Sequence, residues 1–157
     1  MTEVCKKVDF SECLSLYGVF YGSRAKNITI NAPKATTAQE LFRQGNNGSN
    51  ENITLTISRN CKNYTNAFYY NGMKGFMVTE GSEIAASINL QWSSKLSAES
   101  MKSIIKALVD YSGDTDNEYK HTAKFAEEAW ATLEADSAAP DGITWKEYVR
   151  DVKCWNI

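Results

Sequence analysis

The sequence predicts a single α+β domain over residues 1–157, with a mostly antiparallel sheet and one short helix in a β-rich part (1–93), followed by three helices in a helical part (94–157). Two observations lead to this prediction. Apolar residues alternate with polar ones in segments 52–58 and 83–92, which is the period of a strand with one buried face. From residue 94 onward the apolar spacing becomes three or four, the period of an amphipathic helix. Strands first and helices last are typical of an α+β fold.

The strands are expected in the first 93 residues. Segment 13–21 is apolar on both sides, and segment 27–31 follows it and ends before Pro33. In segment 52–58 the apolar face is Ile53, Leu55 and Ile57. No internal repeat is evident, so we expect neighbouring strands to be joined by hairpins and loops.

A β-hairpin is expected over residues 67–79. Segments 67–70 and 73–79 flank Asn71-Gly72, and an Asn-Gly pair favours the two-residue turn of an antiparallel hairpin because both positions need positive φ.

Four helix starts are indicated by capping signals. Thr37 and Glu40 form a potential capping box for a short helix that would end at Gly45. The three later helices are expected to begin at Ser97, Thr115 and Thr144. We expect these three helices to cover the apolar face of the sheet and to leave its Thr-, Ser-, Asn- and Gln-rich face open.

Composition and charge limit the classes of function. The chain is 43% hydrophobic with a net charge of −2, which is typical of a globular protein and gives no general attraction for nucleic acid. No apolar run approaches the roughly 20 residues that span a bilayer, so no membrane partner is expected. The first ten residues are charged and lack the apolar core of a signal peptide.

The four cysteines leave two interpretations open. Cys5, Cys13, Cys61 and Cys154 form no C-x-x-C pair, and with one histidine in the chain they do not support a zinc site. They are either reduced thiols of an intracellular protein or two disulfides of a secreted one. Glycosylation sequons at Asn27, Asn47, Asn52 and Asn63 fit the secreted alternative. We favour the intracellular interpretation.

No catalytic motif or cofactor site is expected. Four acidic residues crowd one region and are weak candidates for a hard cation: Asp110, Asp114, Asp116 and Glu118. The simpler interpretation is that they favour the positive end of a helix dipole, so we expect no metal. Segment 136–147 starts and ends like an EF-hand loop but has Ala138 and Pro140 at ligand positions. The single His121 is expected on the solvated face of the second helix.

The predicted hairpin provides a candidate binding face. A two-residue turn would place four residues on one side: Tyr69, Lys74, Phe76 and Val78. Aromatic residues beside a cation are typical of protein interfaces, although a loop covering them is the alternative. Nucleic acid is a weaker fit because few basic residues lie nearby.

We therefore expect a small non-enzymatic binding or inhibitor-type protein that acts on another protein through its sheet face or hairpin. A secreted disulfide-bonded domain and an enzyme without a recognisable motif are the alternatives.

Overall fold

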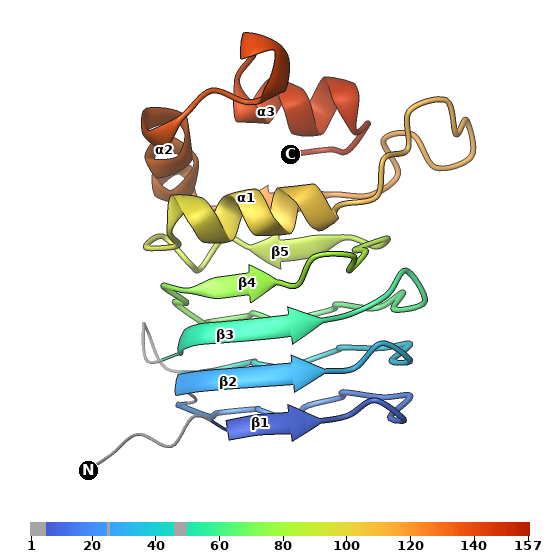
Figure 1. Ribbon diagram of the computed structural model, residues 1–157, viewed down its shortest axis with the longest axis vertical. Helices are drawn as coiled ribbons and strands as arrows, with labels where there is room; N and C mark the ends of the chain where they lie inside the picture. Colours follow the sequence, from blue (N-terminus) through green and yellow to red (C-terminus); the bar gives the residue numbers. More distant parts are fainter. Residues whose placement is uncertain (1–5, 25, 46–49) are drawn as a thin grey trace.

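The N-terminal half forms a stack of coils, as the computed structural model shows for residues 6–24, 26–45 and 50–157 (Figure 1). Four strands lie side by side in chain order and all run parallel: β1 (Lys6–Asp9), β2 (Lys26–Asn31), β3 (Glu51–Thr56) and β4 (Phe76–Val78). Lys6 pairs with Ile28, Ile28 with Ile53, and Ile53 with Phe76, so successive partners are 22, 25 and 23 residues apart. Each such unit is one coil of a solenoid.

The predicted antiparallel sheet, its hairpin and the absence of an internal repeat are therefore wrong. Asn71-Gly72 forms no hairpin turn, because Asn71 is buried and its side-chain amide donates to the carbonyl of Phe42 at 2.8 Å. The two segments beside it have different places in the coil. Residues 67–70 end a turn segment on the back of the third coil, whereas β4 adds to the sheet as its next parallel strand.

Turn segments 15–22, 37–44 and 63–70 form the opposite wall of the coils, behind the strands in Figure 1. Every second N–H donates to the next coil at 2.7–3.0 Å, and most of those between bond within their own turn. The donors to the next coil are Leu16, Gly18, Phe20 and Gly22 in the first coil and Ala38, Glu40, Phe42 and Gln44 in the second.

Equivalent turn positions need a left-handed backbone. Gly18, Glu40 and Asn66 have φ of 60°, 56° and 53° at matching places in three coils. The predicted short helix from Thr37 to Gly45 is therefore wrong, since a left-handed Glu40 interrupts it. Glu40 pairs with Arg43 at 2.6 Å instead of capping a helix.

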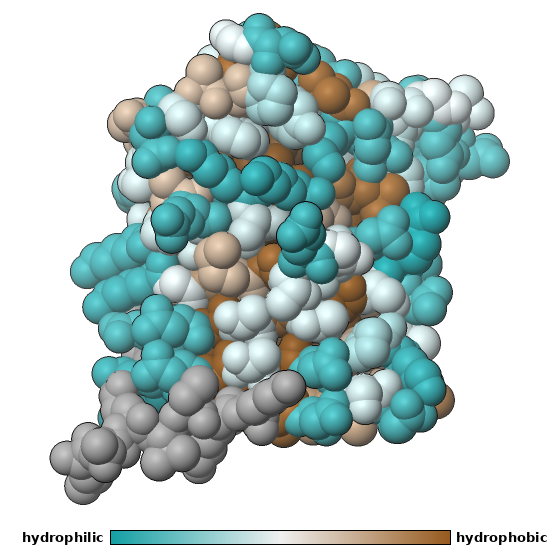
Figure 2. All heavy atoms as spheres, viewed as in Figure 1, coloured by the Kyte–Doolittle hydropathy of each residue, from teal (hydrophilic) through white to brown (hydrophobic). Residues whose placement is uncertain are grey.

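The core lies between the strands and these turn segments. Ile53, Leu55 and Ile57 are buried while Thr54, Thr56 and Ser58 are half-exposed, as their alternation predicts. A column of phenylalanines runs along the coil axis: Phe20 stacks on Phe42 (ring centroids 5.2 Å apart) and Phe42 on Phe68 (6.2 Å). The open side of the sheet is mostly of intermediate hydropathy over the strands (Figure 2).

The C-terminal helices close the β4 end of the stack rather than covering the sheet face, which corrects the expected packing (Figure 1). The sheet face that was expected to receive them is already covered by the turn segments. Helix α1 (Ala98–Ala107) lies along β4, where the Ser100 and Ser103 hydroxyls accept from the N–H groups of Phe76 (3.0 Å) and Val78 (2.8 Å). These bonds satisfy donors that an edge strand would otherwise expose.

The remaining elements are short. Strands β5 (Ile88–Leu90) and β6 (Ala123–Phe125) form a separate parallel pair. They are followed by α2 (Glu127–Asp136), a 3-10 turn η1 (Pro140–Gly142), α3 (Trp145–Glu147) and a π-helical turn η2 (Tyr148–Val152). Among the helices described, none is long and apolar enough to cross a membrane.

Two of the three predicted C-terminal helix starts are confirmed. The Ser97 side chain accepts from the N–H of Ser100 at 3.2 Å, and Thr144 forms a complete capping box with Glu147. The start at Thr115 is wrong, because turns and β6 occupy residues 114–125 and α2 begins only at Glu127.

Candidate functional site: an exposed aromatic strip

The residues of the predicted binding face do not share a surface. Phe76 (0% exposed) and Val78 (6%) point into the core from β4. Tyr69 lies half-buried on the turn side of the third coil. Lys74 is exposed and pairs with Glu51 at 3.1 Å. The four residues would lie on one face only in the hairpin, which the chain does not form.

The turn side of the coils instead carries a row of aromatic side chains and one arginine. We call it the aromatic strip: Tyr21, Arg43, Tyr69, Tyr70 and Trp92. Tyr21, Arg43 and Tyr69 occupy equivalent positions in three coils, since Gly22 N–H donates to the Arg43 carbonyl and Gln44 N–H to the Tyr69 carbonyl. The solenoid therefore aligns side chains that lie far apart in the sequence.

Arg43 lies between two tyrosine rings. Its guanidinium carbon is 5.9 Å from the ring centroid of Tyr21 and 5.6 Å from that of Tyr69, within the range of a cation–π contact. The Glu40 carboxylate accepts from Arg43 and raises its pKa, so the guanidinium stays charged. The Tyr21 hydroxyl donates to the Gln44 side chain at 2.9 Å, which fixes the first ring of the strip.

Tyr70 and Trp92 form the most exposed part of the strip. Their rings stack with centroids 4.5 Å apart and planes 26° apart, and Tyr69 meets both edge-on. Tyr70 is 48% exposed and Trp92 36%. Stacked rings that remain this exposed offer flat apolar surface without needing to rearrange.

Tyr70 also has an unfavourable backbone conformation. Its φ is 52°, and the matching positions in the other coils are Gly22 (65°) and Gln44 (58°). A left-handed conformation costs a side-chain-bearing residue about 1–2 kcal/mol. A large aromatic residue at a position that favours glycine is what a site selected for surface chemistry would show.

The weak metal candidates form no metal site. Asp110, Asp114 and Glu118 accept from the N–H groups of Ser112, Asp116 and Gly113 at 2.8, 3.2 and 2.8 Å. These bonds shape an exposed turn. No group of three or more potential metal ligands occurs in residues 6–24, 26–45 and 50–157.

The described cysteines are unpaired thiols. Cys13 is exposed, Cys61 and Cys154 are buried, and Cys5 lies outside the described residues, as does the sequon at Asn47. The amides at two other sequons are already engaged: Asn52 donates to Asn27 (2.8 Å) and Asn63 to Gln39 (3.1 Å).

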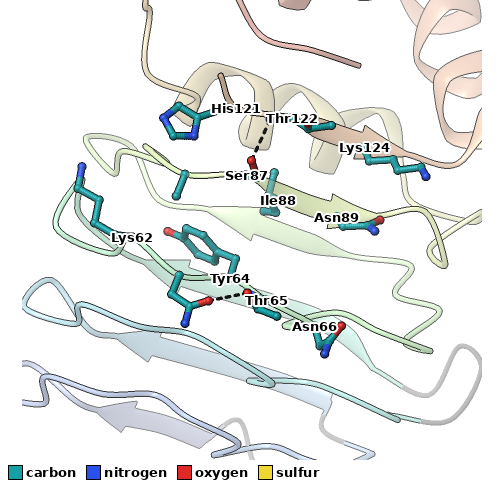
Figure 3. A pocket seen from close by; sticks show the side chains of 12 residues that line it. Lys62, Tyr64, Thr65, Asn66, Ser87, Ile88, Asn89, His121, Thr122 and Lys124 are labelled. Carbon is teal, nitrogen blue, oxygen red and sulfur yellow. Dashed lines mark hydrogen bonds between the residues drawn. The ribbon is translucent and has the colours of Figure 1, made fainter. Parts of the chain in front are cut away.

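His121 does not lie on a solvated helix face as the sequence suggests. It precedes β6, half-buried against Tyr111 and Trp155 (ring centroids 5.1 and 5.5 Å away). Burial, together with the charges of Lys62 and Lys120, lowers its pKa. It also lines a groove of about 410 Å³ between the third coil and β6 (Figure 3).

Sequence reasoning found Tyr69 but not the rest of the strip. Tyr21, Arg43 and Tyr69 are 22 and 26 residues apart, and that spacing acquires meaning only once the coil is known. The recurrence of Asn-Ile-Thr at residues 27 and 52 was the available signal. The chain matches no family model, and no curated protein or solved structure is detectably similar to it.

Proposed function

We propose that this protein is a non-catalytic binding module that docks another protein through its aromatic strip. The exposed stack of Tyr70 on Trp92, continued by Tyr69 and Arg43, is the observation that supports this function. Trp, Tyr and Arg are the residues that most often dominate the binding energy of protein interfaces. The proposal keeps the expected mode of action and moves the surface from the hairpin to the turn side.

The rigidity of the strip supports the same function. Its backbone is hydrogen-bonded from coil to coil, and Tyr21 and Arg43 are held by Gln44 and Glu40. Side chains that are already ordered lose little conformational entropy when a partner covers them. The surface therefore suits a partner that approaches as a preformed face.

The direct test uses Tyr70→Gly. Glycine relieves about 1–2 kcal/mol of left-handed strain, whereas losing the ring contacts costs about 0.5–1.5 kcal/mol. We therefore expect the free energy of unfolding to change by less than about 1 kcal/mol while partner binding falls at least about tenfold, the size of one lost contact of about 1.4 kcal/mol. Binding is measured by interferometry against a purified partner identified by affinity capture with the wild-type protein.

Two further variants make the result specific. Tyr119→Ser is the matched control, because Tyr119 has nearly the same exposure (46%) and a left-handed φ of 56° but lies outside the strip. Met77→Ser alters the open sheet face. Loss of binding in Met77→Ser with full binding in Tyr70→Gly would place the interface on the sheet and refute the proposal.

A further inference from the structure

The hydrogen-bond ladder of the turn side stops after the third coil. Between the first and second coils, and again between the second and third, four N–H groups donate to the next coil. Within the described residues, no backbone bond joins segment 63–70 to the fourth coil at residues 86–93. The fourth coil turns away here, because β5 pairs with β6 and the Ile88 N–H donates to the carbonyl of Thr122 at 2.9 Å.

This break leaves two donors at the groove without a partner in the described part of the chain. Tyr64 and Asn66 are equivalent to Ala38 and Glu40, whose N–H groups point to the next coil and donate to it. The N–H groups between them are satisfied: Thr65 donates to the Asn63 side chain at 2.9 Å and Ala67 to the Tyr64 carbonyl at 2.9 Å. Tyr64 and Asn66 both line the groove.

The side chains around these donors make the groove positive. Lys62 on the third coil and Lys124 on β6 lie on opposite walls, with His121 beside Lys62 (Figure 3). None of the residues lining this groove is acidic, although the whole chain carries a net charge of −2. Neither lysine forms an ion pair with the described residues.

We propose that this groove is a binding site for an oligophosphate group. Unpaired backbone N–H groups at Tyr64 and Asn66 provide donors for phosphate oxygens, as in anion-binding loops. The ammonium groups of Lys62 and Lys124 supply charge from both walls, which suits an elongated anion better than a compact one. This site is separate from the aromatic strip, so its test does not depend on the proposed protein partner.

The experiment is an NMR titration of the ¹⁵N-labelled protein with inorganic tripolyphosphate. We expect the amide signals of Tyr64 and Asn66 to shift strongly, and those of Thr65 and Ala67, whose donors are already engaged, to shift less. The signal of His121, the single histidine, should show a raised pKa in the complex, because the ligand opposes the charges of Lys62 and Lys120. Arg59 and Asp114 also face His121 and are unchanged in the comparison.

Lysine variants and two other ligands complete the test. We expect Lys62→Ala and Lys124→Ala each to weaken binding about tenfold and Lys95→Ala, an exposed lysine outside the groove, to leave it unchanged. Orthophosphate and succinate should bind more weakly than tripolyphosphate. A nucleoside triphosphate that binds more tightly would identify a nucleotide as the source of the phosphates, and equal affinity would identify the phosphate chain alone.

Two results would overturn the proposal. One is the absence of any shift at Tyr64 and Asn66 at about 10 mM tripolyphosphate, well above the weakest affinities of specific sites. The other is an affinity that Lys62→Ala and Lys95→Ala reduce equally, which would indicate general attraction to lysines.

Discussion

Burial gives His121 a measurable effect on stability at acid pH. In the folded protein its pKa is lowered by burial and by Lys62 and Lys120, whereas the unfolded chain keeps the ordinary value of about 6.5. The unfolded state therefore takes up the proton first as the pH falls. Stability is lost from about pH 6.5 downward until the folded-state pKa is passed.

We predict that His121→Gln weakens this dependence. The free energy of unfolding in urea, compared between about pH 7.5 and about pH 5, should fall less in the variant than in the wild type. Carboxylates titrate in both proteins and cancel in the difference. An identical loss of stability in the two proteins would show that His121 is not buried as described.

Lys153 illustrates a residue whose role the sequence does not indicate. It is 7% exposed, and its ammonium donates to the carbonyls of Leu108 and Lys106 at the end of α1. Burial lowers its pKa. More than 40 residues separate donor and acceptors, so no local pattern could reveal this cap.

At the scale of elements, local signals were the reliable ones. Ser97 and Thr144 were predicted as helix starts because a cap needs only the next three residues. Strand partners depend on residues 22 to 25 positions away, and the Asn-Gly pair at 71–72 misled because its local preference was overridden by the burial of Asn71.

The repeat itself was hidden by the chemistry of its positions. Backbone hydrogen bonds align the coils, so few side chains have to recur. Gly18, Glu40 and Asn66 share a left-handed backbone without sharing a residue type. Asn-Ile-Thr does recur in β2 and β3, but it was interpreted as two glycosylation sequons.

The phenylalanine column should carry a large share of the stability of the coils. Phe42 is fully buried between Phe20 and Phe68, so we predict that Phe42→Ala lowers the free energy of unfolding by about 3–5 kcal/mol. Phe20 is half-buried at the end of the column, so Phe20→Ala should cost clearly less. Urea denaturation of both variants checks this order, and equal losses would contradict the stacked arrangement.

At the scale of the whole molecule, the thiols report on the packing of both halves. Cys13 is exposed, Cys61 is buried in the coils and Cys154 under the C-terminal helices. Burial also raises the pKa of Cys61, which lowers the reactive thiolate fraction.

We predict that iodoacetamide labels Cys13 in the native protein and labels Cys61 and Cys154 only after unfolding. Peptide mapping by mass spectrometry without reductant measures each site. Fast native labelling of Cys61, or a disulfide between any two of these cysteines, would contradict the structure and return the secreted, disulfide-bonded alternative.

Trp92 offers the most direct test of the claim that the aromatic strip is a binding surface. The other three tryptophans, Trp130, Trp145 and Trp155, are at most 4% exposed, so Trp92 is the one that acrylamide can reach in the native protein. We would measure acrylamide quenching of the free protein and of its complex with the purified partner, with Trp92→Phe as control. The account predicts a quenchable fraction that is absent in Trp92→Phe and protected in the wild-type complex. Unchanged quenching in a saturated complex would mean that the partner binds elsewhere, and the strip would then not be the interface.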